Sequence, residues 1–411
     1  MGQCGYGKGE KRVEYYEYEN KKLIPYECPR DSLPDKHYCK FHDSDYAQTN
    51  PDDVMRTFYK LVDEAVQNTK PLFCIGFYLP REVNLTNKEF KDRVYFSHTT
   101  FTKEADFYRA AFNNAVDFKR AAFNNAVDFY RAAFNNAVDF YRAAFNNTAN
   151  FTRSDFINEV WFDKSRFPSP KADKDFKDNT ICIKFDYCKF RKLMQFIGDP
   201  STPLELGLVS LKGVNLSNVE FHNVKWLKTK NLFFSRYMII DEALLGKGKN
   251  TNYEDVSKIY NQLRKNYESK LLFNEASNFF IGEMEAIKKS LWNGTRREKM
   301  ASIPYSLYKA LALYGESYFL PLVIWTPALI GLFIAWRFIT GECSLQSVSN
   351  VISPHITQTC SPKDFFIDSF AAYFQFPRST INPVDTIERI MSIPILGTAF
   401  IAIRRKFERI K

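Results

Sequence analysis

The chain has 411 residues, of which 45% are hydrophobic and 16% aromatic, so it has room for two or three domains. Its formal net charge of +10 suits either nucleic acid or an anionic membrane surface as a partner. The five histidines are scattered, and neither HExxH nor G-x-S-x-G occurs. Because no catalytic constellation follows from the spacing, we expect a protein that is not an enzyme.

Residues 1–48 predict a loop-rich Cys/His module. The first 18 residues lack the apolar core of a signal peptide, so we expect the amino terminus to stay in the cytoplasm. In a reducing compartment such a cluster more often binds metal than forms a disulfide, and four soft or borderline ligands suit a closed tetrahedral zinc site. The alternative is a module with unliganded thiols. The candidate ligands are Cys4, Cys28, Cys39 and His42.

Residues 49–82 predict a helix followed by an entry strand. Asn50 is a good capping residue, and Pro51 suits the first helical turn. The apolar positions that follow share one helical face. They are Val54, Phe58, Leu61, Val62 and Ala65. We therefore expect a helix from Pro51 to about Asn68.

An 11-residue unit is then written four times between Phe107 and Asn150, as FYRAAFNNAVD, FKRAAFNNAVD, FYRAAFNNAVD and FYRAAFNNTAN. Phe recurs with steps that alternate between six and five residues, which is the period of neither a helix nor a flat strand. A small residue stands two positions before each Phe, giving the pattern small-x-Phe-x-x. The repeat phenylalanines are Phe101, Phe107, Phe112, Phe118, Phe123, Phe129, Phe134, Phe140, Phe145, Phe151 and Phe156.

This pattern resembles the pentapeptide-repeat family, whose chains wind into a right-handed, four-sided β-helix with one five-residue unit on each side. The resemblance implies a mainly β fold for residues 83–228, with the large and small residues filling a narrow shaft and the other three facing water. Surface loops interrupt five to six coils, and the helix near Pro51 covers the open first coil. The segment CPRDSLPDKHYCKFHD also resembles a Cys/His segment that precedes the repeats in some members.

Two 11-residue units make a coil of 22 residues, so each position should lie above the position 22 residues later. This predicts outer ladders in which side chains of one type stack. The predicted ladders are Arg109, Arg131 and Arg153; Arg120 and Arg142; Asp117 and Asp139; Asn113 and Asn135; and Asn124 and Asn146.

Helical periodicity returns in residues 251–300, which resemble the helical hairpin that follows the repeats in membrane-attached relatives. The alternative is that this hairpin only packs against its neighbours. Residues 301–411 predict a membrane domain with transmembrane helices at about 317–338 and 383–404, because Ser317 to Trp336 contains no charged residue. Pro321 and Pro327 suggest kinks in the first helix.

Basic residues crowd the chain before Ser317 and after Ile403, whereas only Lys363 and Arg378 are basic between Phe338 and Ile387. Both termini should therefore be cytoplasmic and the intervening loop should lie outside. Two cysteines in this loop are disulfide candidates, the alternative being two free thiols. They are Cys343 and Cys360.

The segment FFIDSFAAYFQFP lies between the two spans and predicts a short apolar helix. The order of a span, a short helix and a second span resembles a potassium-channel pore unit in outline. In that comparison the short helix is the candidate pore helix, and Asp368 is its one acidic residue. A potassium filter uses a Gly-containing loop, yet no Gly occurs from Glu342 to Leu396. The alternative is a helix that packs within the membrane or at its surface.

The function favoured by these patterns is a membrane-anchored, cytoplasm-facing scaffold that binds an unknown protein partner. The alternative is a pore-loop protein with weak or no ion selectivity. A third reading, a DNA mimic that modulates topoisomerases, requires an acidic surface. Residues 96–167 hold nine Lys/Arg against eight Asp/Glu, which disfavours it. We expect no nucleic acid partner and no cofactor beyond a structural zinc. The sequence is compatible with either a monomer or a homo-oligomer.

Overall fold

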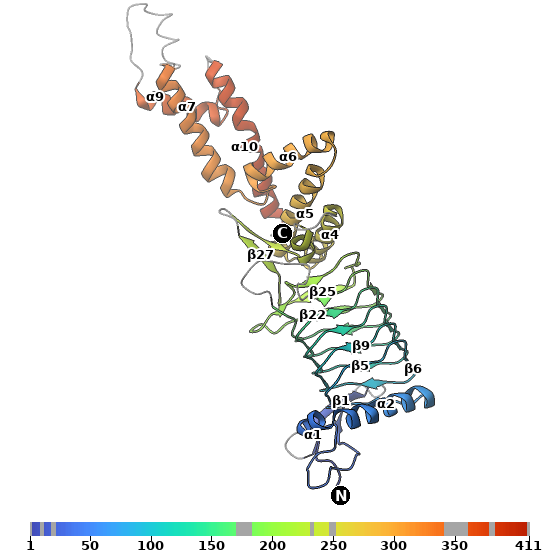
Figure 1. The fold of residues 1–411 in the computed structure, drawn as a ribbon. Helices are drawn as coiled ribbons and strands as arrows, with labels where there is room; N and C mark the ends of the chain where they lie inside the picture. The colour runs from blue at the N-terminus through green and yellow to red at the C-terminus, as the bar shows by residue number, and fades with distance from the viewer. Residues whose placement is uncertain are drawn as a thin grey trace, which may run out of the picture. The chain divides into compact units, whose positions relative to one another are not determined.

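The computed structural model describes residues 2–8, 12–17, 22–169, 183–230, 234–245, 252–340, 361–377 and 383–408. The chain divides into two compact units, Met1–Glu283 and Met284–Lys411. The first unit is built on a β-solenoid of about six turns over residues 72–225 (Figure 1). The second is helical in its described residues.

Short strands stack into parallel sheets that form the sides of the solenoid. Each regular strand pairs with the strand 22 residues further on, so that Phe112 lies beside Phe134 and Phe123 beside Phe145. This is the register that the Phe period predicts. The first two sides contain β3 (Leu72–Phe73), β7 (Val94–Tyr95), β11 (Val116–Asp117), β15 (Val138–Asp139), β19 (Val160–Trp161), β22 (Met194–Ile197) and β25 (Val219–His222); and β4 (Tyr78–Leu79), β8 (Thr100–Phe101), β12 (Ala122–Phe123) and β16 (Ala144–Phe145).

The remaining sides complete each coil. They contain β5 (Val83–Asn84), β9 (Ala105–Asp106), β13 (Val127–Asp128), β17 (Ala149–Asn150), β20 (Ile183–Lys184) and β24 (Val209–Ser210); and β6 (Glu89–Phe90), β10 (Ala111–Phe112), β14 (Ala133–Phe134), β18 (Asp155–Phe156) and β21 (Lys189–Phe190). In the last coils β23 (Leu204–Glu205) pairs in parallel with β26 (Val224–Lys225). An antiparallel pair, β27 (Leu227–Lys230) and β28 (Ser235–Met238), follows.

The shaft of the solenoid is filled by stacked phenylalanine rings. The predicted repeat phenylalanines are all at most 1% exposed, and Phe129 stacks between Phe107 and Phe151 with ring centroids 4.7 and 4.8 Å away. Burying one such ring stabilises the fold by roughly 1.5–3 kcal/mol. Where the small inward residue is polar it is satisfied locally, as when Ser154 Oγ donates to the Phe129 carbonyl at 2.7 Å.

The three polar residues of NNAVD each make a hydrogen bond that fixes a corner. The first Asn forms a ladder, in which Asn135 Nδ2 donates to Asn113 Oδ1 at 2.7 Å. The second accepts from the backbone N–H of the next residue, as Asn136 does at 2.8 Å. The aspartate closes a turn, since Asp139 Oδ1 accepts from the Tyr141 N–H at 2.7 Å. The second and third bonds satisfy backbone N–H groups that short strands would otherwise leave unpaired, and the first joins neighbouring coils.

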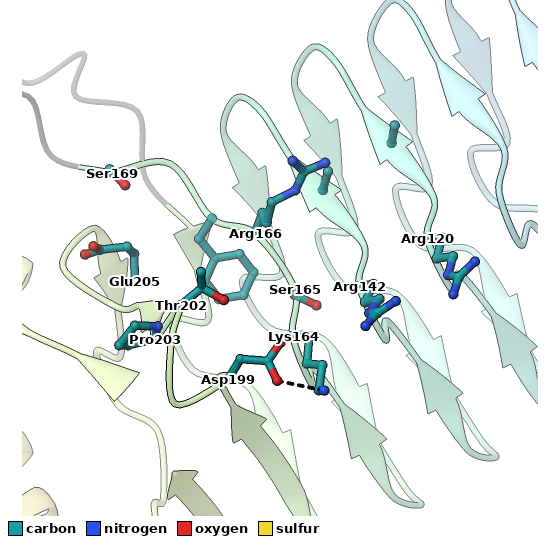
Figure 2. Close-up of a pocket in the computed structure, with 13 residues that line it drawn as sticks. Arg120, Arg142, Lys164, Ser165, Arg166, Ser169, Asp199, Thr202, Pro203 and Glu205 are labelled. Atoms are coloured by element: carbon teal, nitrogen blue, oxygen red, sulfur yellow. Dashed lines mark ion pairs between the residues drawn. The ribbon is translucent and has the colours of Figure 1, made fainter. Parts of the chain in front are cut away.

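At other corners a basic residue adopts the left-handed conformation, with φ between 52° and 61°. These residues form the two predicted columns, and the second is extended by Lys164. Figure 2 shows Arg120, Arg142 and Lys164 in a row on successive coils. The residues concerned are Arg109, Arg131 and Arg153 in one column and Arg120, Arg142 and Lys164 in the other.

The solenoid begins earlier than the sequence analysis placed it, at Leu72 instead of Val83. The first half-coil was missed because its inward residues, including Cys74 and Phe77, do not follow the small-x-Phe pattern. Helix α2 spans Pro51–Asn68, as predicted, and packs on this first coil (Figure 1). It buries an apolar stripe that contains Val54, Met55, Phe58, Val62 and Ala65. The short helix α1 (Ser44–Thr49) precedes it.

The antiparallel strands β1 (Val13–Glu17) and β2 (Lys22–Tyr26) form an N-terminal hairpin that contacts the first side of the solenoid. Tyr15 meets Tyr95 edge-on at 5.1 Å, and the Lys119 ammonium lies 4.6 Å from the centroid of the Tyr16 ring. Asp117 is 0% exposed in this region, which corrects the expectation that its ladder faces water. A side covered by another part of the chain could not be recognised from the repeat alone.

The last coil is closed by the helix α4 (Tyr253–Ser269), whose Tyr267 ring stacks on Phe221 and accepts a hydrogen bond from Trp226 Nε1 at 3.0 Å. This contact supports the packing role that the sequence left as an alternative. The predicted stripe of α4 is buried, namely Val256, Ile259, Leu263 and Tyr267. The short helix α3 (Ile240–Leu245) precedes α4 and α5 (Phe273–Trp292) follows it.

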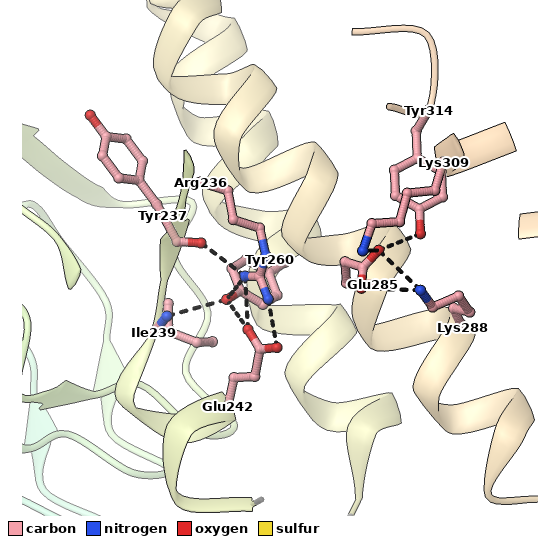
Figure 3. Close-up of polar contacts among 9 residues, drawn as sticks. All are labelled: Arg236, Tyr237, Ile239, Glu242, Tyr260, Glu285, Lys288, Lys309 and Tyr314. Atoms are coloured by element: carbon pink, nitrogen blue, oxygen red, sulfur yellow. Dashed lines mark hydrogen bonds and ion pairs between the residues drawn. The ribbon is translucent and has the colours of Figure 1, made fainter. Parts of the chain in front are cut away.

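A buried ion pair joins β28, α3 and α4 (Figure 3). Arg236 contacts both carboxylate oxygens of Glu242, at 2.7 and 2.9 Å, and donates to the Tyr260 hydroxyl at 3.0 Å. Tyr260 in turn donates to Glu242 at 2.6 Å. Gly282 of α5 lies against the same tyrosine, because an added Cβ would come within 2.5 Å of the Tyr260 ring. These hydrogen bonds hold β28, α3 and α4 together at the end of the first unit.

In the second unit the helix α6 (Arg296–Ala312) leads to the candidate spans, Leu320–Thr340 and Pro383–Glu408. The first span contains the π-helix η1 (Leu320–Trp325) and α7 (Thr326–Thr340), and the second is α10 (Pro383–Glu408). The predicted irregularity at Pro321 takes the form of this π-helical turn. There the Pro321 carbonyl accepts a hydrogen bond from Thr326 Oγ1 at 2.8 Å. Helix α9 (Pro362–Tyr373) contacts α7 and α10. Cys343 and Cys360 lie outside the described residues.

Asp117 gives a pH-dependent prediction. Burial and the neighbouring Asp139 carboxylate raise the pKa of Asp117 to about 6. Because this lies above the ordinary value, the contribution to stability is full below about pH 4 and is lost as the pH rises through about 6. Asp117→Asn should therefore increase the free energy of unfolding at pH 7 by up to about 3 kcal/mol.

The repeat itself shows that an amide fits this position, because Asn150 replaces the aspartate in the last unit and donates to Asp128 at 3.0 Å. Urea unfolding of the wild type and Asp117→Asn at pH 4 and pH 7 measures the effect. The gain should appear at pH 7 and disappear near pH 4. A difference of equal size at both pH values would contradict the assignment.

Candidate functional site

The four Cys/His residues predicted from the sequence converge in the N-terminal module. Their candidate ligand atoms, from Cys4, Cys28, Cys39 and His42, all lie within 4.8 Å of one another. Cys28 Sγ lies 3.9 Å from Cys39 Sγ, and His42 Nδ1 lies 3.5 Å from Cys4 Sγ. A tetrahedral zinc ion separates two sulfurs by about 3.8 Å and a sulfur from a nitrogen by about 3.5 Å. The cluster thus has the spacing of a four-ligand metal site.

Groups around the ligands hold them in a binding orientation. His42 Nε2 lies 2.9 Å from the Ile75 carbonyl oxygen, which leaves Nδ1 facing the sulfurs. The Cys39 backbone N–H donates to Cys4 Sγ at 3.2 Å. The Tyr6 ring stacks on His42 with centroids 3.9 Å apart. The orientation of the His42 ring is therefore set by the contact of Nε2 with Ile75 and by the stacking of Tyr6 on its face.

The electrostatics of the cluster favour thiolate. The hydrogen bond with the Cys39 thiol lowers the pKa of Cys28 to about 3. Burial acts to lower the pKa of His42, but hydrogen bonds with the neighbouring sulfurs raise it to about 9. An unloaded cluster therefore holds a thiolate beside an imidazolium, and a metal ion would displace that proton on binding.

The same module is joined to the first coil of the solenoid. The Tyr78 N–H donates to the Phe41 carbonyl at 2.8 Å, and the Phe41 ring stacks on Phe77 at 4.0 Å. The Arg30 guanidinium lies 4.8 Å from the Phe77 centroid. Gly76, which directly precedes Phe77, has φ of 72°, and a Cβ there would lie 2.0 Å from the Tyr6 hydroxyl. The Cys/His cluster and the first coil therefore form one packed region.

A second polar cluster lies within the candidate membrane spans, where charged groups are expensive and usually functional or structural. Arg337 of α7 is 0% exposed and pairs with Asp385 at 2.6 Å and Glu388 at 2.9 Å, both on α10. Ser369 of α9 donates to the other oxygen of Glu388. Arg337 thus connects α7 to α10, and Glu388 connects α10 to α9. Asp368, the pore-helix candidate, is 4% exposed on the same short helix.

The sequence analysis did not identify Arg337 or its partners. The available signal was an Asp and a Glu three positions apart on an otherwise apolar helix, which places both on one face. That pattern predicts a buried cation opposite, and Arg337 directly follows the uncharged run that ends at Trp336. Residues distant in sequence had to be paired across two helices, so spacing alone could not make the assignment.

Metal content gives a direct prediction for the Cys/His cluster. Purified protein should contain about one metal equivalent per chain, because four ligands close one site. Cys39→Ser should lose it and lower the melting temperature, since Cys39 lies between Cys28 and His42. Cys188→Ser is the control, because that buried thiol donates to the Phe151 carbonyl in the solenoid wall. Elemental analysis that finds no metal in well-folded wild-type protein would refute the site.

Arg337 gives a prediction for the second unit. Arg337→Met would leave two buried carboxylates without their cation and should destabilise the helical unit by about 3–5 kcal/mol. Arg404→Met is the matched control, because Arg404 is exposed and, among the described residues, forms its ion pair within α10, with Glu408. Thermal unfolding in detergent should show a clear loss for the first variant and little change for the second. Equal melting curves would show that the buried pair contributes nothing.

Comparison with known proteins identifies the repeats. Residues 96–143 and 129–167 match the family described as Pentapeptide repeats (9 copies). No curated protein and no solved structure matches the chain. The matched residues form the regular coils, with the 22-residue register and the phenylalanine shaft described above. Residues 96–167 therefore carry pentapeptide repeats, within a solenoid that extends beyond them on both sides.

Proposed function

We propose that this protein is a non-catalytic scaffold, anchored in a membrane, that presents its solenoid to a protein partner in the cytoplasm. Pentapeptide-repeat proteins are generally non-catalytic. The observation that carries the proposal is the pairing of an ordered repeat surface with two long apolar helices. These helices have 21 and 26 residues, and an 18-residue stretch of each has a mean hydropathy of 1.9 and 1.5, respectively. Such lengths suit a bilayer.

The solenoid surface is suited to recognition because its exposed side chains are held in fixed positions. Asn124 and Asn146 are linked along the stack by a 2.9 Å hydrogen bond, and the Tyr108 and Tyr130 rings stack 5.7 Å apart. A surface ordered before binding loses less side-chain entropy when a partner docks. Tyrosine and arginine, which recur on this surface, are also the residues enriched at interface hot spots.

We further propose that the ion at Cys4, Cys28, Cys39 and His42 is zinc with a structural role. Three sulfurs and one imidazole nitrogen form a common closed zinc site, which leaves no open position for a substrate. The cluster belongs to the module that covers the first coil, where exposed strand edges and the phenylalanine shaft would otherwise meet water. Zinc would therefore stabilise the end of the solenoid rather than act on a ligand.

The proposed orientation follows from charge. Arg404, Arg405 and Lys406 close the second span, and basic residues tend to remain on the cytoplasmic side. In a variant with Cys343 and Cys360 changed to Ser, a membrane-impermeant maleimide applied to intact cells should label a cysteine introduced at Ser353. It should not label one introduced at Asn124, which is exposed on the solenoid. Labelling of Asn124→Cys in intact cells would contradict the orientation.

Scaffolding itself is tested by photo-crosslinking. A photoreactive residue at the exposed position Asn124 or Asn135 should give a discrete adduct with a cytoplasmic protein. The same residue at Lys91, exposed outside the four exact repeats, is the control for random collision. Adducts of equal yield at all three positions, or none at the two repeat positions, would count against a specific docking surface.

A pore is the second candidate, favoured by one observation. Helix α9 is a short, capped helix between the two candidate spans and contacts both, and its capping box joins Ser361 and Asp364. Reconstituted protein in a planar bilayer separates the two functions. Single-channel steps that vanish when residues 364–377 are deleted would support the pore. A silent bilayer together with specific crosslinks from the solenoid would support the scaffold.

A further inference from the structure

A groove of about 610 Å³ lies beside the second basic column of the solenoid. Arg120, Arg142 and Lys164 line it along successive coils, and Arg166 lies on its other side (Figure 2). The segment that contains Asp199, Thr202 and Pro203 closes one end. This volume is in the range of small-molecule sites.

The groove contains more positive than negative charge, and its acids are already paired. Lys164 binds Asp199 at 2.7 Å, and Glu205 binds Lys225 at 2.5 Å. Lys225 does not line the groove. In the described parts of the chain, the three lining arginines have no carboxylate partner. They are Arg120, Arg142 and Arg166.

The positive field also acts on the residue before Arg120 in the column. Burial, with a further contribution from the Arg120 charge, lowers the pKa of His98 to about 4. His98 is therefore neutral at pH 7 and does not add another repelling charge. The backbone does not require cations here, because Gly or Asn would adopt the left-handed corner more readily than Arg120 or Arg142. An anionic ligand that binds to these stacked cations would explain why they occupy this column.

The close spacing of the cations in the column favours an anion that carries its charges close together. Coils stack at about 4.8 Å, so the bases of successive cationic side chains repeat at about that distance along the solenoid. Acidic side chains on one face of an extended peptide repeat at about 6.7 Å, which does not match. A short chain of linked phosphates carries several charges within a small length. It can also accept the paired N–H groups of each guanidinium.

The floor of the groove is apolar and gives room for more than phosphate. Ala122, Ala144 and Phe167 line it between the cations. Ser165 is not an available donor, because its hydroxyl is already bonded to the Phe140 carbonyl at 2.6 Å. The guanidinium groups are therefore the main donors for recognition, beside Lys164 and Thr202, and the apolar floor is left to contact the body of a larger ligand.

We propose that this groove binds a linear oligophosphate, either free or as the phosphate chain of a nucleotide. Arg142 and Arg166 hold the phosphates from two sides, and Arg120 extends the contact along the column. The ligand offsets the repulsion within the cationic column. This proposal goes beyond the scaffold function and does not depend on it, since every lining residue belongs to the solenoid unit.

Isothermal titration calorimetry of the full chain in a non-ionic detergent, with sodium tripolyphosphate as the probe, tests the site. Saturable binding of one equivalent is expected. Arg142→Gln and Arg166→Gln should each weaken it about tenfold or more, because each removes a charged hydrogen-bond donor. Equal affinity for tripolyphosphate and metal-free adenosine triphosphate would assign binding to the phosphates alone. Tighter binding of the nucleotide would add a contact with the apolar floor.

Arg131→Gln is the matched control. Arg131 is exposed and has the same left-handed backbone, with φ of 57°, but it belongs to the other column. Its substitution by Gln removes the same charge as Arg142→Gln. Its affinity should equal that of the wild type, and thermal melting should show all three variants folded. Equal losses in Arg131→Gln and Arg142→Gln would reveal general charge attraction and overturn the site. Absence of saturable binding, or tighter binding of a hexaglutamate peptide, would overturn it as well.

Discussion

The stacking of phenylalanine rings along the solenoid axis is the interaction on which the rest of the structure depends. Each side of a coil contributes a strand of only two residues in the regular region, which is too short to be stable alone. The rings are buried in a continuous column and turn many weak strands into one cooperative stack. The 22-residue register follows from them, since Phe129 must lie between Phe107 and Phe151. The outer ladders are a consequence of that register.

A stack of this kind has two open ends, and the chain closes them by different means. At the first coil, α2 covers the shaft and the Cys/His module bonds to Ile75 and Tyr78. At the last coil, Tyr267 of α4 continues the ring stack beyond Phe221. Closing both ends protects unpaired strand edges from other chains. The flanking modules are therefore needed for the repeats to exist as a soluble domain.

Much of the solenoid follows from the sequence because one residue type at one period fixes it. The Phe spacing predicts the buried rings and the ladder of Asn113 and Asn135. The four metal-ligand candidates were also identified by residue type, and the fold brings them together. Features made by tertiary covering were not predictable in this way. Asp117 is buried by a neighbouring segment, and the groove wall that contains Asp199 depends on the path of an irregular excursion.

The alternating period of the repeat has a consequence for how such a chain can lengthen. One 11-residue unit is half a coil, so inserting a single unit would rotate everything that follows by half a turn. Residues of the Arg142 column would then fall in line with the Arg131 column, and the excursion that closes the groove would move to the opposite face. Inserting two units leaves every face in phase and only lengthens the stack by about 4.8 Å. The surface pattern is therefore preserved only when the repeat is lengthened by whole coils, that is, by two 11-residue units at a time.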